Sequence, residues 1–410
     1  MLRKISFGLR FLKQNLPSIE ILEYPTWEEY VKKLKEGWDV VGFSFFTNEI
    51  PEVLKMVEEA RKRGVQEVWA GNYGALTPGI EGYFDKIFIG YAENEVRKTL
   101  GENPKEIEHP PLIVILRLGP INFKYKPFGV LFTQRGCPIG CNFCQTPIFC
   151  PRPFKISLNS IENVLKEYKK RGIEEVVILD ENFGILPKHT EYIVELLGKY
   201  GVLWSVMTRA DYILKNFNYW IENGFISGFI GIENLSPLIL EKIGKKEEIE
   251  KIKECVKKMH EKNRYIIGYY IIGFENETEQ EIREKLIRVS SFHIDFNQLC
   301  ILTPLPRTPL WYEIDRKYGI FDRDWHHWDT KHLVWNHPYV SPSKMRQLLL
   351  WGFKILNPAL RYYEGIARLT RTYLHIKGWG AGWRYLLWDA PYHAFKIRKY
   401  EKSFIFTKPF

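Results

Sequence analysis

The sequence predicts an α/β protein with three parts. Two segments with alternating patterns and one change in composition are the basis of this prediction. Residues 1–102 and residues 129–312 each alternate apolar strand patterns with amphipathic helix patterns, which is typical of parallel sheets covered by helices. Residues 313–410 lose this alternation and are rich in aromatic and basic residues. We therefore expect an N-terminal open parallel sheet, a linker over residues 103–128, a central partial (β/α)6 barrel and a mainly helical, basic and aromatic C-terminal module.

The N-terminal part alternates helix and strand patterns in a regular order. The predicted helices cover residues 27–36 and 51–63, and the predicted strands cover residues 39–45, 67–70 and 86–89. Short apolar strands separated by helices predict an open, Rossmann-like parallel sheet. Residues 103–128 contain five prolines and little periodicity, so a linker is expected there.

The central part contains six strand patterns in succession. The predicted strands lie near residues 130–134, 176–180, 203–207, 225–232, 265–273 and 295–302. Amphipathic helices, such as those over residues 161–171 and 277–290, separate them. Six such units predict a barrel shorter than the usual eight, with its ligands at the carboxyl ends of the strands.

Composition excludes several classes of protein. A chain of 410 residues with 45% hydrophobic and 26% charged residues is typical of a folded protein and not of a disordered or fibrous one. Six cysteines without a leader pattern at Met1 predict a reducing, cytoplasmic location and argue against a disulfide framework. The longest apolar stretch, residues 265–274, is about half of what a membrane-spanning helix needs, so we expect at most a peripheral position on the inner face of a membrane.

The formal net charge of +10 is concentrated at the C-terminus. Residues 341–410 contain 13 Lys and Arg against 3 Asp and Glu, whereas the rest of the chain is balanced. A helix is predicted over residues 343–356, and the tryptophans of residues 341–410 are Trp351, Trp379, Trp383 and Trp388. Aromatic residues beside cations favour an anionic membrane or a lipid substrate as the partner. A helical cap on the barrel with a solvated basic face is the alternative. Nucleic acid is disfavoured because no signature of a nucleic-acid-binding fold is present.

The most specific pattern lies on the loop after the first barrel strand. Cys137, Cys141 and Cys144 have the spacing C-x3-C-x2-C. Three thiolates at this spacing can bind three irons of a [4Fe–4S] cluster and leave the fourth iron open to another ligand. Gly136 and Gly140 allow the backbone to follow such a cluster closely.

A structural zinc site is the alternative for these cysteines, with Cys150 as a fourth ligand, because C-x2-C pairs also bind zinc. Zinc sites usually combine two short pairs, and Cys150 has no matching partner, so the cluster is favoured. The sequence leaves the roles of Cys150, Cys255 and Cys300 open.

The cysteine spacing, with Phe143 directly before the last cysteine, resembles the radical S-adenosylmethionine (SAM) superfamily. The resemblance implies a [4Fe–4S] cluster on Cys137, Cys141 and Cys144 and SAM chelated to the open iron. It also implies an external electron donor, whose electron breaks SAM to give a 5′-deoxyadenosyl radical.

The ends of the later barrel strands extend the resemblance and imply contacts with SAM. The implied cofactor-binding residues are Phe143, Asp180, Asn182, Arg209, Glu233, Ile272 and Gly273. In the family, the arginine pairs with the SAM carboxylate, the glutamate accepts hydrogen bonds from the ribose, and the glycine-bounded strand lies against the adenine. From residue types alone, Asp180 could equally be a turn or cap residue and Arg209 a bridge to a neighbouring helix.

The N-terminal part resembles the cobalamin-binding domains that are fused to some radical SAM barrels, in residues 39–45 and in the strand that ends at Gly71. It lacks the D-x-H-x-x-G motif, has residues 70–76 in place of G-G-x-H-x-T, and begins at what is expected to be the first helix. The domain is therefore expected to be truncated, and the sequence leaves cobalamin binding open.

Together, these features predict a radical SAM enzyme that abstracts hydrogen from an unactivated carbon of a hydrophobic substrate. An archaeal isoprenoid lipid, joined by a new C–C bond, is the expected substrate class. Two alternatives remain: cobalamin-dependent methyl transfer to a protein side chain or small molecule, and a non-catalytic iron–sulfur or zinc protein.

Overall fold

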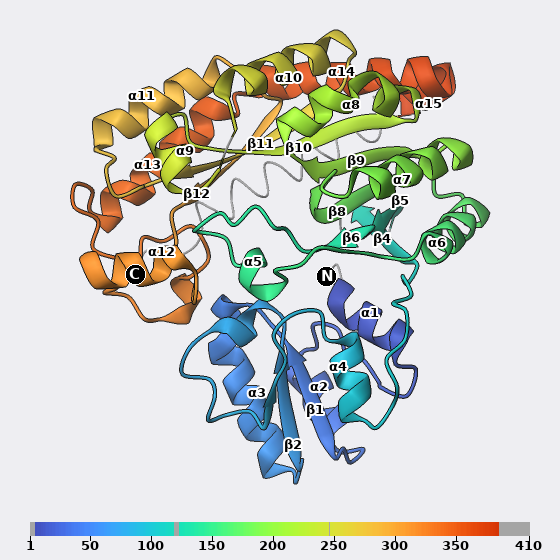
Figure 1. Ribbon diagram of the computed structural model, residues 1–410, viewed down its shortest axis with the longest axis vertical. Helices are drawn as coiled ribbons and strands as arrows, with labels where there is room; N and C mark the ends of the chain where they lie inside the picture. Colours follow the sequence, from blue (N-terminus) through green and yellow to red (C-terminus); the bar gives the residue numbers. More distant parts are fainter. Residues whose placement is uncertain (1–4, 119–122, 246, 385–410) are drawn as a thin grey trace.

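The computed structural model describes residues 5–118, 123–245 and 247–384 (Figure 1). The N-terminal domain contains a three-stranded parallel sheet in sequential order, as expected for an open α/β sheet. Its strands are β1 (Val40–Ser44), β2 (Glu67–Gly71) and β3 (Lys86–Ile87).

Helices cover both faces of this N-terminal sheet. They are α1 (Phe7–Asn15), α2 (Trp27–Leu34), α3 (Ile50–Lys62) and α4 (Glu93–Thr99). Helices α2 and α3 share one apolar core with Phe43 and Val68, whereas α1 and α4 pack on the opposite face against Trp69. Helix α2 begins at a capping box in which Thr26 and Glu29 exchange hydrogen bonds with each other's backbone amides.

The central part is a curled sheet of seven strands in the order β12-β11-β10-β9-β8-β5-β4. Its strands are β4 (Leu112–Leu118), β5 (Phe123–Leu131), β8 (Glu175–Phe183), β9 (Leu203–Thr208), β10 (Phe225–Glu233), β11 (Tyr265–Ile272) and β12 (Phe296–Ile301). The six strands from β5 to β12 run parallel, which confirms the predicted six-unit partial barrel.

Helices pack on the convex face of the half-barrel (Figure 1). They are α6 (Leu158–Lys170), α7 (Pro187–Tyr200), α8 (Ala210–Glu222), α9 (Pro237–Lys242), α10 (Ile249–Glu261) and α11 (Glu279–Ser290). The register aligns Ile178, Val206 and Ile266 across neighbouring strands, and all three are fully buried. The intervening row of Met207, Phe229, Ile267 and Phe296 is only half-buried, because it faces the concave side.

The prediction of a strandless linker over residues 103–128 is wrong, because β4 and β5 pair there as antiparallel strands of the central sheet. Pro127 lies opposite Ile115 in this pair. On its other side, β5 pairs with β8 only through residues 129–131. Pro127 lies outside this pairing, so its missing N–H costs no hydrogen bond to β8. The central domain therefore begins at Leu112 rather than at residue 129.

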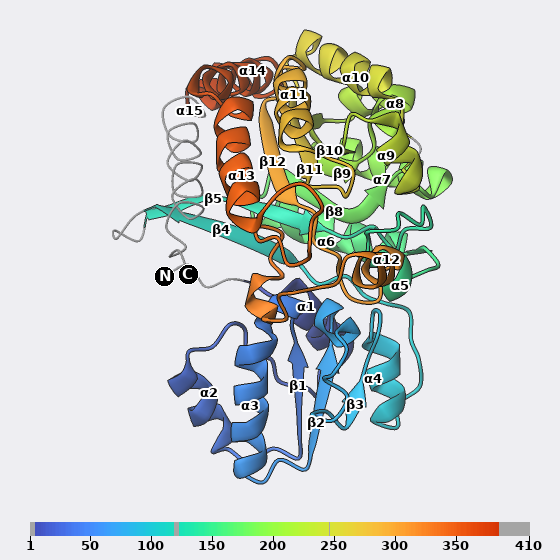
Figure 2. The same cartoon turned by 90° about the vertical axis from the view of Figure 1, so that its left-hand side faces the viewer.

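The described part of the C-terminal module is helical, as expected. It contains α12 (Pro309–Lys317), the 3-10 turn η3 (Trp325–His327), α13 (Pro342–Leu356), α14 (Ala359–Lys377) and α15 (Trp379–Arg384). Helix α13 packs against α11 and β12 and buries Leu348 and Phe353 (Figure 2). Helix α14 covers the amino-terminal ends of β9 and β10, where Ile366 contacts a small apolar cluster. Helices α13 and α14 thus pack on the central domain, and the partner of the module stays a prediction.

The tryptophans of this module have different surroundings. Trp351 lies under the guanidinium group of Arg283, at 4.6 Å from the ring centroid, whereas Trp379 and Trp383 are 75% and 51% exposed. Trp388 lies outside the described residues. None of the helices in the described ranges is both long enough and apolar enough to cross a bilayer.

Candidate functional site

The three predicted cluster ligands lie on one loop, residues 136–145, which we call the cysteine loop. It connects β6 (Gln134–Arg135), which pairs with β7 (Phe154–Lys155), to the short helix α5 (Thr146–Phe149). Gly136 has a φ of +84°, and a Cβ there would lie 2.8 Å from the Cys150 sulfur. A side chain at Gly136 would therefore be strained and would also clash.

The thiols of the cysteine loop are close enough to influence one another. Burial is the main cause that raises the pKa of Cys141 to about 11; Lys245 opposes the change, and the charges of Cys144 and Cys137 act in the same direction as burial. Burial also raises the pKa of Cys144, with Cys137 acting in the same direction. In the ranges that the structure describes, no group of three or more His, Cys, Asp or Glu side chains stands ready to hold a metal ion. The donor set itself, three neighbouring sulfurs on one loop, is the chemistry that an iron–sulfur cluster requires.

Asp180, in β8, is hydrogen-bonded to the segment that leads into the cysteine loop. It is fully buried and accepts hydrogen bonds from the Thr133 amide at 2.6 Å, the Thr133 hydroxyl at 2.5 Å and the Gln134 amide at 3.2 Å. Burial raises the pKa of Asp180 to about 7, although these three donors favour the charged form. Asp180 thus positions the residues before the cysteine loop, and its contact with SAM stays a prediction.

Asn182, two residues later, does reach the cysteine loop. Its side chain hydrogen-bonds the Cys137 thiol and so lowers the pKa of that thiol, while burial, the larger effect, raises it. The Oδ1 atom of Asn182 is buried and has no hydrogen-bond partner among the described residues. An acceptor in this condition, next to a cluster ligand, fits a place where a polar ligand supplies the missing donor.

Glu233 lies at the carboxyl end of β10 with a φ of +60°, where the register with β11 shifts. Its carboxylate accepts a hydrogen bond from Lys245 Nζ at 2.9 Å, and the same ammonium group donates to the Gly231 carbonyl at 2.6 Å. The negative charge of Glu233 raises the pKa values of Cys141 and Cys144, which places it beside the cysteine loop. Glu233 therefore lies near the cysteine loop, and its contact with the ribose of SAM stays a prediction.

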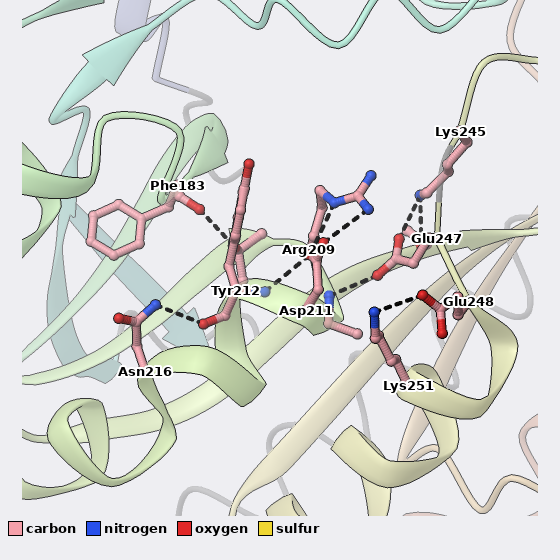
Figure 3. Close-up of polar contacts among 12 residues, drawn as sticks. Phe183, Arg209, Asp211, Tyr212, Asn216, Lys245, Glu247, Glu248 and Lys251 are labelled. Atoms are coloured by element: carbon pink, nitrogen blue, oxygen red, sulfur yellow. Dashed lines mark hydrogen bonds and ion pairs between the residues drawn. The ribbon is translucent and has the colours of Figure 1, made fainter.

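Arg209 precedes α8 and forms a two-point contact with Asp211, at 3.0 Å and 3.1 Å (Figure 3). Burial disfavours its charge, but the hydrogen bonds with Asp211 and the charge of Glu247 outweigh burial and raise its pKa. Arg209 also lowers the pKa of Cys137, so it too lies near the cluster ligands. Its guanidinium group is oriented by the protein before any ligand arrives.

The remaining predicted residues are placed mainly by the core. Ile272 is buried, and Gly273, with a φ of +83°, donates its amide hydrogen to Glu277 at 2.9 Å. A Cβ at Gly273 would lie 2.7 Å from Met345 of α13. Phe143, within the cysteine loop, packs partly against the central core. The contacts of these residues with SAM stay predictions.

Sequence reasoning missed Lys245 and Glu247, which complete a buried charged network with Arg209 and Glu233. Figure 3 shows Arg209, Lys245 and Glu247 of this network. The Lys245 side chain is only 7% exposed, and its ammonium lies 3.6 Å from Glu247, which accepts a hydrogen bond from the Ala210 amide at 2.9 Å. In the sequence, these residues belong to a Lys-Lys-Glu-Glu run that resembles an exposed turn. Only Gly244, whose Cβ position would face the Gly140 carbonyl at 3.5 Å, marks the close approach of this segment to the cysteine loop.

Comparison with protein families identifies the central domain. The model of the radical SAM superfamily matches residues 131–287, from the end of β5 into α11, and this range includes all three cysteines of the loop. Residues 131–287 are therefore a radical SAM domain. This domain implies a [4Fe–4S] cluster and SAM, and the three thiols, Asn182 and Glu233 would hold them. When bound, such a cluster would supply the electron that cleaves SAM.

Two curated relatives of this radical SAM enzyme are named as methyltransferases. The chain is 25% identical over 362 residues to bacteriochlorophyllide d C-12(1)-methyltransferase of Chlorobaculum tepidum, covering 82% of this chain and 77% of that protein. It is 29% identical over 275 residues to an uncharacterized methyltransferase, PH0819, of Pyrococcus horikoshii. That match covers 63% of this chain and 58% of the relative, so the chain spans less than two thirds of that relative's length.

Solved structures share the fold of this radical SAM enzyme. The methyltransferase TsrM from Kitasatospora setae, with cobalamin and a [4Fe–4S] cluster bound, superposes with a TM-score of 0.63 at 16% identity, over 76% of this chain and 75% of that chain. OxsB, a cobalamin-dependent SAM radical enzyme, gives a TM-score of 0.62 at 15% identity, over 90% of this chain and 70% of that chain. A match over 90% of the chain necessarily includes much of the N-terminal domain together with the half-barrel.

Proposed function

We propose that this chain is a cobalamin-dependent radical SAM methyltransferase that transfers the methyl group of SAM to an apolar small molecule. The observation that carries the proposal is the direction of the N-terminal sheet (Figure 2). In open α/β sheets ligands bind at the carboxyl ends of the strands, and here those ends meet the segment that carries the cluster ligands. The Tyr73 hydroxyl, after β2, lies 3.2 Å from the Thr146 hydroxyl, and the ring of Tyr73 stacks on Phe149 with centroids 4.3 Å apart.

The same edge has features that suit a large flat cofactor such as cobalamin. Phe46, after β1, is half exposed, and its ring is nearly parallel to that of Tyr73, with 7° between the ring planes. Flat apolar surfaces of this kind can lie against the corrin ring. The segments after β1, β2 and β3, residues 45–49, 72–76 and 88–92, contain no histidine, so they would give cobalt no imidazole ligand.

The relatives favour methyl transfer over the expected lipid reaction. Two of the relatives are named as bacteriochlorophyllide methyltransferases, one as an uncharacterized methyltransferase, and the two solved structures are of radical SAM enzymes with cobalamin bound. None of these names describes C–C bond formation on an isoprenoid lipid. An apolar acceptor remains part of the proposal, because the half-buried row of Met207, Phe229, Ile267 and Phe296 lines the concave side of the sheet. A protein side chain as acceptor would need polar groups for its backbone, which this row does not offer.

The products formed from SAM test this proposal. Radical cleavage gives 5′-deoxyadenosine, whereas donation of the methyl group leaves S-adenosylhomocysteine. Purified protein with a reconstituted cluster, reductant and hydroxocobalamin, without oxygen, is expected to retain cobalamin on gel filtration and to form both products. Deoxyadenosine without S-adenosylhomocysteine, in protein that binds no cobalamin, would contradict methyl transfer and restore the C–C bond-forming alternative.

For the partner of the C-terminal module, we propose an anionic membrane surface that contacts α14 and α15. Residues 342–384 contain eight Lys and Arg and a single acidic residue, Glu364. Some of these cations serve the fold, since Arg361 donates to the Ser290 carbonyl and Arg368 pairs with Asp295. Exposed Trp379 and Trp383, with Arg371 nearby in the sequence, combine aromatic rings with positive charge, as surfaces that bind membranes do.

Vesicle binding tests this partner. Changing Trp379 and Trp383 together to Ala is expected to weaken binding to anionic vesicles several-fold, because each ring loses its interfacial contact. Binding of the unchanged protein should also weaken as salt is added, since charges are screened over roughly 10 Å at 0.1 M. Trp27→Ala, at a half-exposed tryptophan of the N-terminal domain, is the matched control. Equal binding to anionic and neutral vesicles at low salt would contradict the proposal.

A further inference from the structure

The loop between β3 and α4 of the N-terminal domain contacts residues on both sides of the cysteine loop, Glu181 of β8 and Phe149 of α5. The Tyr91 hydroxyl donates a hydrogen bond to one oxygen of Glu181, and the other oxygen accepts the Gly136 amide at 3.0 Å. Gly136 directly precedes Cys137. At the other end, the backbone of Gly90, with a φ of +102°, approaches so closely that a Cβ would lie 2.9 Å from the Phe149 carbonyl oxygen.

A buried ion pair joins the same two segments. Arg135, which precedes Gly136, forms an ion pair with Glu93 at 2.8 Å, and both side chains are more than 95% buried. The guanidinium group lies 4.2 Å from the ring centroid of Phe11 and 4.1 Å from that of Tyr91. Cation–π contacts with both rings thus add to the attraction of the carboxylate.

This ion pair is expensive for a residue that only stabilises the fold. The Nε and Nη1 atoms of Arg135 are buried without hydrogen-bond partners among the described residues, so desolvation is only partly offset. Apolar residues of similar volume would fill the same space at lower cost. The charged pair adds a specific geometry between Glu93 and Arg135, which lies two positions before Cys137.

We infer that Tyr91 and Glu93 are positioning residues for the iron–sulfur cluster: through Glu181 and Arg135 they fix the backbone from which Cys137 reaches the cluster. The N-terminal domain thereby takes part in holding the cluster, independently of any ligand of its own. The inference rests on the cluster that the superfamily implies and does not depend on methyl transfer.

Two conservative variants of the full-length protein test the inference. Tyr91→Phe removes one hydroxyl and keeps the ring, and Glu93→Gln removes one charge at constant shape. Both are expected to release iron from the reconstituted cluster to a chelator about tenfold faster or more, the factor corresponding to one charge-assisted hydrogen bond. In apo-protein, peptides covering residues 133–150 should exchange amide hydrogen faster than in the unchanged protein. The reduced cluster should also give an altered electron paramagnetic resonance spectrum.

Matched controls separate positioning from general loss of stability. Glu95→Gln makes the same chemical change on an exposed residue of α4, and Val57→Ala weakens the core of the N-terminal domain away from the loop. Both controls should release iron at the original rate. Original rates in Tyr91→Phe and Glu93→Gln, or equally fast release in Val57→Ala, would overturn the inference. If Glu93→Gln does not fold, Tyr91→Phe alone decides. Cobalamin and a methyl acceptor are absent from the assay, so failure of the proposed methyl transfer leaves its result unaffected.

Discussion

Replacing Cys137, Cys141 or Cys144 with Ala is expected to abolish cluster assembly and reduce SAM cleavage to background. Each cysteine supplies one thiolate of a three-thiolate site, and a cube held by two sulfurs loses the geometry that leaves one iron open. Iron content, visible absorbance and 5′-deoxyadenosine formation, measured without oxygen, check the prediction.

Cys255→Ala is the control for this series. Cys255 is fully buried in α10 on the convex side, where burial strongly raises the pKa of its thiol. The variant loses some packing but should keep both the cluster and SAM cleavage. Full activity of Cys141→Ala would remove the cluster assignment, and zinc instead of iron in the unchanged protein would favour a structural metal site.

Changing Lys245 to Met is expected to lower the free energy of unfolding by about 3–5 kcal/mol. Its ammonium is hydrogen-bonded to Glu233 and lies 3.6 Å from Glu247, so the change removes the nearest cation from two buried carboxylates. Burial already raises the pKa of Glu247, and Lys245 lowers it, so the variant should raise that pKa further. Denaturant unfolding of the apo-protein near neutral pH measures the loss.

The pH dependence and a neighbouring lysine provide the controls. A carboxyl group whose pKa is raised in the folded state destabilises the protein as pH increases above its unfolded pKa of about 4.3. The deficit of Lys245→Met should therefore shrink as the pH is lowered toward that value. Lys251→Met, which removes an exposed pair with Glu248, should cost less than about 0.5 kcal/mol. A similar loss in both variants would show that the buried network is not special (Figure 3).

Patterns of local origin were predictable from the sequence. The period of apolar residues and the positions of glycines predicted β1, α3 and the five parallel strands from β8 to β12 close to their observed bounds, because each depends on neighbours within a few residues. The cysteine motif was predictable for the same reason, since its three ligands lie within eight residues of one another. Pairing between distant segments was not predictable from the sequence. The segments that form β4 and β5 resembled a linker, because proline suppresses the strand pattern. The pairing is tolerated because Pro127 has a strand, β4, on one side only.

The sequence by itself determined the fold class, and it predicted the cluster ligands and the candidates at the strand ends. The tertiary structure decided what those candidates do, because burial and the arrival of a second segment set the chemistry of a side chain. Asp180 accepts a hydrogen bond from the Thr133 backbone, and Glu233 lies beside the thiols. Lys245, part of a run that resembles an exposed turn, became the buried cation between two carboxylates once α9 and the following turn folded onto the cysteine loop. A charge has no fixed role in a sequence, since its energy depends on which groups the fold brings within a few ångströms.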